Sequence, residues 1–502
     1  MLFRSPYRLE AFSDVGLTQA FVQLVIDEFG RREKPRLERL WTYYRNPLRP
    51  VGLGGFGGGD AANRWYAQAQ EVGLPSRIVG AAGRADGSPP MDDRARQRRE
   101  AVIENDIAWR IQSMVDFMFG RPIEIRSQSP DPGRAAAIDR ILARVWEQSG
   151  GIALLQDIAL LGHVYGHADL ALKMSDDFAA SPGGTDIEPW LDHLRIDVFE
   201  PRRGVPLLDP RDYRRLRAYI LSYERTNNRE EDAGGLRRFL SRGIEFGSRR
   251  SRSVMTEIIS GRAWHVYEDG RLVWEQRQGL TRGRVPIVHI QNIAQPFEYA
   301  GLGEVEPLIP LQDELNTRLS DRASRVTLQS FKMYLARGIH GFENARIGPG
   351  QIWSTDNEKA SVEAFGGDAH SPSEEAHIRE VREAMDKVSG IPPLAGGIVQ
   401  GRIGNLSSAT ALRITLMALL AKTARKRITY GNGIARMCEL VLIALHEAGL
   451  FQTDDRDRAV RITWPDPIPE DPRDAVAVAE AKARLGVPAA ELLASLGHRP
   501  IA

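Results

Sequence analysis

A helical run after Pro310 constrains the fold of this chain more than any other feature. Residues 311–337 read as one helix of about 27 residues, which spans roughly 40 Å at 1.5 Å per residue. Leu311, Leu315 and Leu319 mark one side of it, but charged residues interrupt every turn. A helix of this kind is too polar to be buried on all sides. The fold must therefore leave part of a long helix in contact with water.

A second long helical segment is expected at residues 373–394. Ser371 and Glu374 form a capping-box pattern at its start, and Pro372 stands at the first helical position. Between the two helices, residues 338–372 form a compact, glycine-rich insert with β-like sequence. The pattern predicts two long helices joined by a small β element.

A third helical run is predicted at residues 407–447, after a glycine-rich stretch at residues 395–406. The triplet Gly431-Asn432-Gly433 is expected to kink this run. Residues 448–502 hold a strand-like VRITW, a proline-rich connector and one or two short helices.

The part of the chain before Pro310 mixes helices with β-structure. A helix is expected from Leu17 to Tyr44, broken near Pro35. From about Ile187 to Ile293 the sequence changes to short alternating runs separated by Gly, Pro and Asp, which indicates an antiparallel β region. WHVYED and GRLVWEQ, joined through Asp269-Gly270, predict a hairpin because this pair accepts the positive φ of a tight turn. The predicted fold class is α+β and mainly helical.

Composition excludes several classes of protein. With 67 Lys plus Arg against 66 Asp plus Glu, the net charge is +1, so the whole chain cannot coat nucleic acid by bulk charge. The lone cysteine, Cys438, excludes a disulfide framework and favours a reducing compartment. No apolar run approaches the ~20 residues that span a bilayer, and the N-terminus lacks the apolar segment of a secretory signal. We therefore expect an ordinary folded, water-soluble protein.

Two segments could support enzyme chemistry, and each also has an ordinary structural explanation. Gly52, Gly54 and Gly57 have the spacing of a dinucleotide-binding loop, but the preceding RNPLRPV is a poor strand, so a flexible loop is favoured. His163 and His167 stand four residues apart and could seed a metal site on a helix. Gly162 and Gly166 make such a helix doubtful, which favours a packed pair. The chain has no P-loop and no G-x-S-x-G motif.

One block of the sequence is strongly basic. Between Val388 and Cys438 there is no acidic residue, whereas seven positions are cationic: Arg402, Arg413, Lys422, Arg425, Lys426, Arg427 and Arg436. Such a block is often a solvated helix face. It begins, however, in a glycine-rich loop that carries Arg402, and phosphate contact needs only cations and backbone N–H groups. Both interpretations stay open.

The order of these elements resembles the portal proteins of tailed bacteriophages, in particular the large family found in long-tailed phages. The likeness is carried by ENDIAWRIQSMVDFMFGRPIEI, GHVYGHADLAL, VPIVHIQN with the GLGEVEPLIPLQDELNTRLSDRASRV that follows, VSGIPPL before SSATALRITLMALLAKTARKR, and ITWPDPIPEDPRDAVAVAEAKARLG. These segments cover most of the chain in the family's order. Residues 54–59 and the Arg-rich residues 237–252 have no counterpart in the family.

The resemblance implies a portal fold with named parts. These are a wing at residues 1–310, a first stem helix at 311–337, a clip at 338–372, a second stem helix at 373–394, a tunnel loop at 395–406, a long kinked wing helix at 407–447 and a crown at 448–502. Six residues would belong to the DNA-tunnel loop: Gly396, Gly397, Gly401, Arg402, Gly404 and Asn405. Six others would make stem or clip contacts: Arg318, Arg322, Arg325, Glu374, Arg379 and Arg382.

The resemblance also implies a function. The chain would form a homo-oligomeric ring, a dodecamer in the virion, at one capsid vertex. Double-stranded DNA would pass through it without sequence recognition. The ring would dock the large terminase subunit and then a head-tail adaptor, and would meet the major capsid and scaffold proteins. It would assemble in the host cytoplasm, with no catalytic residues, metal, cofactor or membrane. The alternative is a nucleotide- or metal-dependent enzyme that uses Gly52–Gly57 or His163/His167.

Overall fold

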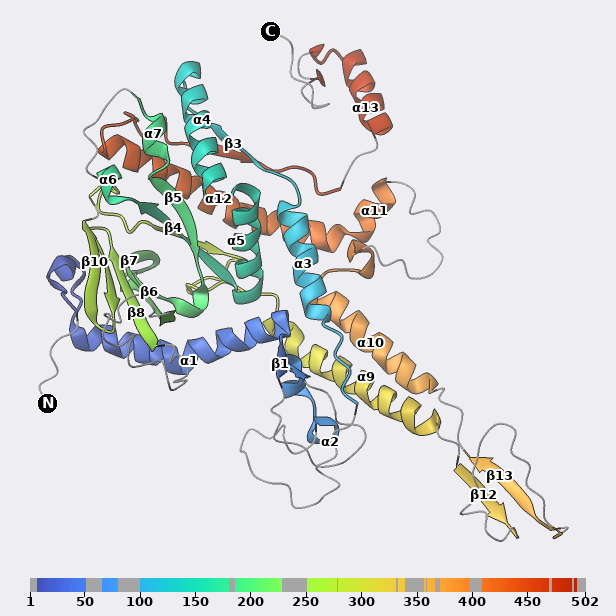
Figure 1. Cartoon of the computed structure of the whole chain (residues 1–502). Coiled ribbons are helices and arrows are strands. Elements are labelled where there is room, and N and C mark those ends of the chain that lie inside the picture. Colours follow the sequence, from blue (N-terminus) through green and yellow to red (C-terminus); the bar gives the residue numbers. More distant parts are fainter. Residues whose placement is uncertain are drawn as a thin grey trace, which may run out of the picture. The chain divides into compact units, whose positions relative to one another are not determined.

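The computed structural model describes residues 7–50, 66–79, 100–179, 186–227, 251–277, 279–330, 333–338, 356–357, 359–365, 371–396, 409–468, 472–489 and 492–493. The chain divides into two compact units (Figure 1). Unit 1 contains residues 1–41, 109–306 and 390–502, and unit 2 contains residues 42–108 and 307–389. The observed mixture of helices and antiparallel sheets agrees with the predicted α+β class.

Unit 1 contains two larger antiparallel sheets. The three-stranded sheet has the order β11-β4-β5, and the five-stranded sheet has the order β10-β9-β8-β7-β6. The strands are β4 (His167–Met174), β5 (Leu194–Phe199), β6 (Gly204–Asp209), β7 (Asp212–Asn227), β8 (Ser251–Ser260), β9 (Ala263–Glu268), β10 (Arg271–Arg277) and β11 (Ile287–Gln291). The predicted hairpin is confirmed, since β9 and β10 pair across Asp269 (φ 48°) and Gly270 (φ 80°).

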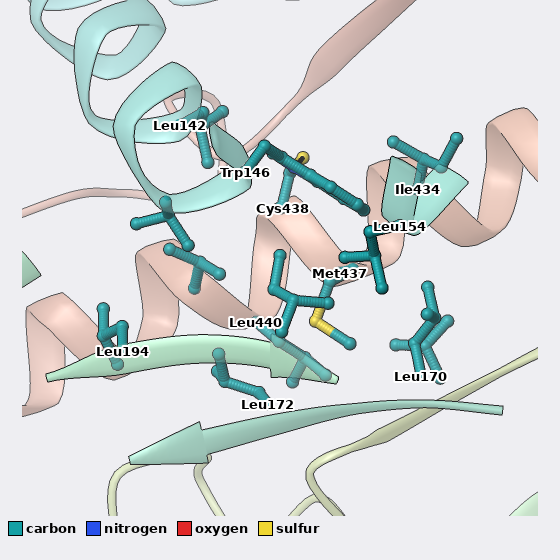
Figure 2. Close-up of a cluster of buried hydrophobic side chains, with 14 of the residues drawn as sticks. Leu142, Trp146, Leu154, Leu170, Leu172, Leu194, Ile434, Met437, Cys438 and Leu440 are labelled. Carbon is teal, nitrogen blue, oxygen red and sulfur yellow. Dashed lines mark hydrogen bonds between the residues drawn. The ribbon is translucent and has the colours of Figure 1, made fainter. Parts of the chain in front are cut away.

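The helices that pack on the three-stranded sheet enclose the largest core (Figure 2). They are α4 (Pro132–Gln148), α5 (Gly151–Tyr165) and α12 (Met417–Glu447). Leu142, Leu170, Met437 and Leu440 are among its buried side chains. Trp146 donates a hydrogen bond to the Sγ of Cys438 at 3.3 Å, and burial raises the pKa of that thiol to about 12. Cys438 is thus a small buried hydrophobe, as expected.

The helical run predicted at residues 407–447 is interrupted at a different place from the one expected. Helix α12 runs without interruption through Gly431–Gly433, and the helical geometry breaks at Leu416, between α11 (Ala409–Thr415) and α12. Gly433 serves close packing instead of a kink, because a Cβ there would lie 2.3 Å from Cγ1 of Ile290. By length and mean hydropathy, α12 is also the one described helix apolar enough to cross a membrane. Its most apolar window is 61% buried, as in a core helix.

Shorter elements complete unit 1. Helix α1 (Gln19–Arg45) passes through Pro35 without the predicted break; its last four residues are counted with unit 2. Strand β3 (Glu124–Ser127) pairs with β14 (Val460–Thr463), which confirms the strand expected at VRITW. The other elements that lie wholly or mostly in unit 1 are η1 (Glu10–Val15), α3 (Asp106–Phe119), α6 (Asp176–Ala179), α7 (Glu188–Leu191), η5 (Pro201–Arg203), η8 (Pro393–Gly396) and α13 (Pro472–Arg484), and η6 (Glu306–Leu308) stands at the boundary with unit 2.

Unit 2 contains the two long helices predicted after Pro310, with different ends. Helix α9 (Ile309–Ser330) stops before residue 337, because residues 333–337 form β12, which pairs with β13 (Ser361–Phe365). Pairing with a segment that far along the chain satisfies the backbone of residues 333–337 in a way that local propensity cannot reveal. Helix α10 (Pro372–Ser389) ends before residue 394, at Gly390, whose φ is +70°. The remaining elements are β1 (Leu48–Pro50), β2 (Tyr66–Gln68), η2 (Ala69–Gly73) and α2 (Ser76–Val79).

Candidate functional site

Helices α9 and α10 form an antiparallel pair within unit 2 (Figure 1). Leu315 and Leu319 on α9 are buried, as are Ile378, Val381 and Met385 on α10. Their spacing of three or four residues places each set on one helix face. The charged residues that interrupt every turn occupy the other faces, so the pair keeps the water-exposed surface that the sequence predicts.

Polar side chains fasten the two helices at separate points. On α9, Glu314 Oε1 lies 2.7 Å from Nε of Arg318, and His377 Nε2 of α10 reaches the same oxygen at 2.9 Å. Farther along, the guanidinium of Arg325 pairs with the carboxylate of Glu374. Two predicted stem residues, Arg325 and Glu374, thus contact each other inside the chain.

The other predicted stem residues differ in their surroundings. Arg382 on α10 donates to Glu104 Oε2 at 2.6 Å. Arg322 on α9 is half-buried and Arg379 on α10 is exposed. Within the described ranges, no carboxylate lies within ion-pair distance of Arg322 or Arg379.

We expect the Arg325–Glu374 pair to contribute measurably to stability. Its side chains are only 31% and 12% exposed, so water screens the attraction less than at an open surface. A double-mutant cycle with Arg325→Gln and Glu374→Gln should give a coupling energy of about 1 kcal/mol in urea denaturation. The control Arg379→Gln should change stability by less than about 0.5 kcal/mol. A coupling energy of zero would contradict the pairing.

Sequence reasoning missed a buried polar row on α9. It consists of Gln312, Asn316 and Ser320, all fully buried. Gln312 Oε1 accepts the backbone N–H of Ile107 at 3.2 Å. Asn316 Oδ1 accepts that of Glu104 at 3.1 Å, and Ser320 Oγ accepts that of Val102 at 2.9 Å. These three side chains accept hydrogen bonds from backbone N–H groups of residues 102–107 and so hold that segment along α9. The four-residue spacing of polar side chains beside Leu315 and Leu319 was the available signal.

A second missed feature is a buried charge cluster in unit 1, made of Glu304, Lys422, Lys426 and His163. Glu304 lies in the GLGEVE turn and is 4% exposed. Its carboxylate oxygens lie 2.9 Å from Nζ of Lys422 and 2.7 Å from Nζ of Lys426, which is 2% exposed. The backbone N–H of Glu304 donates to the carbonyl oxygen of His163 at 2.7 Å. The cluster joins the turn to α5 and α12.

The electrostatics of the cluster favour an ionised carboxylate. Burial by itself raises the pKa of Glu304, but the charges of Lys426 and Lys422 outweigh this and lower it to about 2. Burial lowers the pKa of Lys426 to about 8, although Glu304 acts in the opposite direction. Burial also lowers the pKa of His163 to about 3, so its ring is neutral at pH 7. A single carboxylate thus forms ion pairs with both lysines.

These contacts divide the basic block. Lys422 and Lys426 share the single carboxylate of Glu304, and Arg413 pairs with Asp466 at 2.6 Å. Arg425 and Arg436 are exposed on α12, and no acidic side chain in the described part of the chain pairs with either. The block is therefore partly structural and partly an exposed cationic face.

The predicted tunnel-loop residues can be located only at one end. Gly396 is the last residue of η8, and Gly397, Gly401, Arg402, Gly404 and Asn405 lie outside the described residues. Both flanks of the loop join one small core of unit 1, in which Ile391 and Leu416 pack with Met114, Leu419 and Ile468. The loop is thus attached at both ends to a fixed base.

The alternative enzyme sites gain no support. Gly52–Gly57 lies outside the described residues. Helix α5 ends at Tyr165 and Gly166 has φ +94°, so His163 and His167 do not share a helix. His163 Nδ1 bonds the carbonyl of Ala159 in the helix, whereas His167 Nε2 lies 3.8 Å from Asp169. No group of three metal-ligating side chains occurs among the residues that the structure describes.

No curated protein matches the sequence. Among solved structures, the chain is similar to one in the virion of a native gene transfer agent (GTA) particle, with TM-score 0.44 and 13% identity over 85% of this chain and 99% of that chain. Two similar chains come from the neck of an empty particle, computed with C6 symmetry (TM-score 0.42, 12% identity), and of a native particle, computed with C12 symmetry (0.41, 13%). Each comparison covers 78% of this chain and 89% of that chain.

The decisive match is to a family model. Residues 26–496 match the model described as phage portal protein, SPP1 Gp6-like. The matched range includes both long helices of unit 2 and the whole of α11 and α12. The chain therefore belongs to the SPP1 Gp6-like family of phage portal proteins.

Proposed function

We propose that this portal protein forms a closed dodecameric ring at one vertex of a viral capsid, and that double-stranded DNA is packaged and ejected through its central channel. The match over residues 26–496 carries this proposal. A closed ring needs two different, complementary surfaces on each subunit. The half-buried Arg322 of α9 and the exposed arginines of α10 and α12 (Arg379, Arg425 and Arg436) provide charged surface without an acidic partner among the described residues.

The near-neutral charge of the chain suits a conduit. DNA held by many Lys and Arg contacts would bind tightly and with strong salt dependence, which would slow sliding. With a net charge of +1, the subunit can offer a few cations at the channel without being a polycation as a whole. In this proposal Arg402 and the glycines of the tunnel loop touch phosphates without reading sequence, and Arg322 and Arg379 face neighbouring subunits or the channel.

The same proposal assigns partners and a place of assembly. The β12–β13 element at the end of the stem pair would dock the large terminase subunit during packaging and a head-tail adaptor afterwards. The wing would meet the major capsid and scaffold proteins, and the ring would form in the host cytoplasm. Portal proteins are a structural class, and we propose that this chain likewise performs no catalysis.

The mass of the purified chain in solution tests the ring. A dodecamer of 55.9-kDa chains has a mass of about 670 kDa, which light scattering after size-exclusion chromatography distinguishes from smaller assemblies. We expect a single large species near that mass or at a neighbouring ring number. A monomer at all concentrations and salt conditions would argue against the proposal.

A further inference from the structure

A cationic hollow in unit 1 has no role in the proposed conduit. It has a volume of about 720 Å³ and is bounded by the start of β7, the chain that leads from β10 into β11, and α12. Its floor is apolar, with Val285, Ile287, Val288 and Leu440 buried there. Its lining also contains six arginines and three acids: Arg214, Arg215, Arg217, Arg282, Arg284 and Arg436, with Asp14, Asp209 and Glu439.

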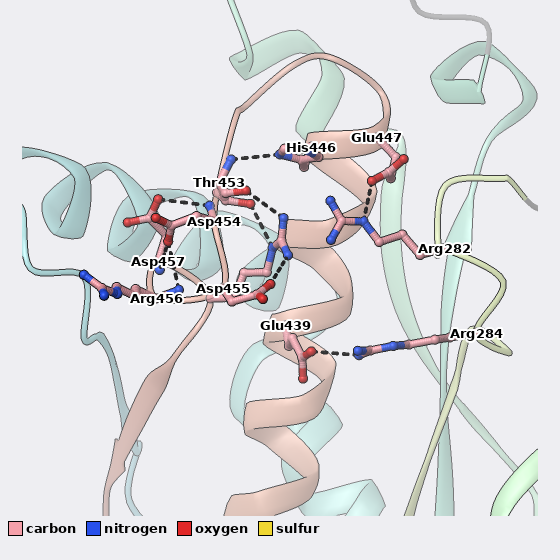
Figure 3. A network of polar contacts seen from close by, with 11 residues as sticks. Arg282, Arg284, Glu439, His446, Glu447, Thr453, Asp454, Asp455, Arg456 and Asp457 are labelled. Carbon is pink, nitrogen blue, oxygen red and sulfur yellow. Dashed lines mark hydrogen bonds and ion pairs between the residues drawn. The ribbon is translucent and has the colours of Figure 1, made fainter.

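Two of these arginines pair with acidic side chains, and a third donates to the backbone. Arg282 pairs with Glu447 at 2.5 Å and Arg284 with Glu439 at 2.7 Å, both on α12 (Figure 3). Arg217 donates to a backbone carbonyl, that of Val15, at 3.1 Å. These contacts hold the rim in place and neutralise two of its charges.

The other three arginines carry positive charge without an acid. In the described part of the chain, no carboxylate lies within ion-pair distance of Arg214, Arg215 or Arg436, and all three side chains are exposed. Arg214 and Arg436 also line a second hollow of about 540 Å³. The two hollows therefore meet at two guanidinium groups without a carboxylate partner, and that of Arg214 donates from Nε to the hydroxyl of Tyr213 at 3.0 Å.

The wall between the hollows is rigid. His289 lines both of them, and its Nδ1 lies 2.7 Å from Oδ1 of the buried Asp169. Its Nε2 lies 2.6 Å from the carbonyl oxygen of Tyr299, and the two rings stack with centroids 3.7 Å apart. The second hollow adds the amides of Gln291 and Asn432 and one carboxylate, that of Glu298. A ligand would thus meet a preformed surface that combines cations, amides and an apolar floor.

This combination selects one class of ligand. A hollow of about 720 Å³ has the size of a site for a small ligand or a few side chains, so a duplex could touch the rim arginines but could not reach the apolar floor. A small inorganic anion would make no use of the apolar floor. Carboxylate side chains suit the planar guanidinium groups of arginine, and clusters of arginine recognise acidic motifs. We propose that the paired hollows bind an acidic peptide segment of a partner protein, with its carboxylates on Arg214, Arg215 and Arg436 and an apolar side chain on the floor.

Fluorescence anisotropy with the full-length protein tests this site. The probe is a fluorescein-labelled peptide of Glu, Asp, Leu and Ser, and its counterpart has Gln and Asn in place of the acids. We expect saturable binding of the acidic probe alone. Arg215→Gln/Arg436→Gln should weaken binding by about tenfold or more, since two charge-assisted contacts are lost. Arg425→Gln, an exposed arginine of α12 outside both hollows, should leave the affinity unchanged.

Several results would overturn the proposal. One is equal affinity of the acidic peptide for the wild type and the double variant. Another is displacement of the peptide by inorganic tripolyphosphate or by a DNA duplex at equal charge concentration, which would assign the hollow to small anions or nucleic acid. A third is a change in the solution mass of the double variant, which would assign the hollow to contacts between copies of this chain. An unchanged urea midpoint would show that the variant is folded.

Discussion

Deletion of residues 396–404 is expected to leave ring formation intact and to abolish DNA packaging or retention. The chain on either side is fixed by the small core that contains Ile391 and Leu416, so subunit folding does not depend on the loop. The loop is rich in glycine and carries one cation, Arg402, which suits the proposed contact with DNA phosphate. The readouts are the ring mass in solution and the DNA content of assembled particles.

A matched variant separates the length of the loop from its chemistry. Replacement of residues 396–404 by Gly and Ser in equal number restores the span but removes Arg402. If the cation matters, this variant should package less DNA than the wild type, and the single change Arg402→Gln should act in the same direction. Full packaging by the deletion variant would refute the role of the loop while leaving the ring itself untouched.

Glu304→Gln is expected to be the most destabilising single change in unit 1. It leaves Lys426, 2% exposed, without its carboxylate, and a buried charge that loses its partner typically costs about 3–5 kcal/mol. Glu306→Gln is the control in the same turn, because Glu306 pairs with Arg36 where both side chains are about half exposed. Such a surface pair contributes about 0–1 kcal/mol. Urea denaturation measures both effects.

A second variant and a pH series identify why Glu304→Gln lowers the stability. Adding Lys426→Met to Glu304→Gln removes the unpaired charge and should recover part of the stability. The pH dependence has a defined sign, because the pKa of Glu304 is about 2 in the folded chain against 4.5 ordinarily. The stability that this carboxylate contributes is complete above pH 4.5 and is lost as the pH falls toward 2. The gap between wild type and Glu304→Gln should narrow in that window; a constant gap would contradict the ion-pair explanation.

Local patterns predict most helices and strands of this chain because they depend on neighbours in the sequence. The hairpin at Asp269-Gly270 and the helix that begins at Pro372 are set by turn and cap residues within a few positions. The predicted end of the first long helix, at residue 337, was wrong because residues 333–337 pair with residues 361–365 as a strand. Helix α12 continues through Gly431–Gly433, where Gly433 packs against Ile290, and the helical run is broken at Leu416 instead. Such contacts leave no local signal.

The sequence likewise predicts only part of the candidate site. Periodicity alone predicts a polar helix pair, but it cannot show that Arg325 meets Glu374 or that Lys422 and Lys426 share Glu304, which lies more than a hundred residues earlier. From the sequence, Gln312, Asn316 and Ser320 are expected on the solvent-exposed face of the helix, although the structure buries them. The tunnel loop and the roles of its residues stay predictions that rest on the family.

Electron microscopy of the negatively stained, purified full-length protein tests the central claim most directly. The account predicts closed rings of one subunit number, seen end-on with a central hole wide enough for a double helix. Single compact particles without a hole, at concentrations where the protein is stable and folded, would contradict it.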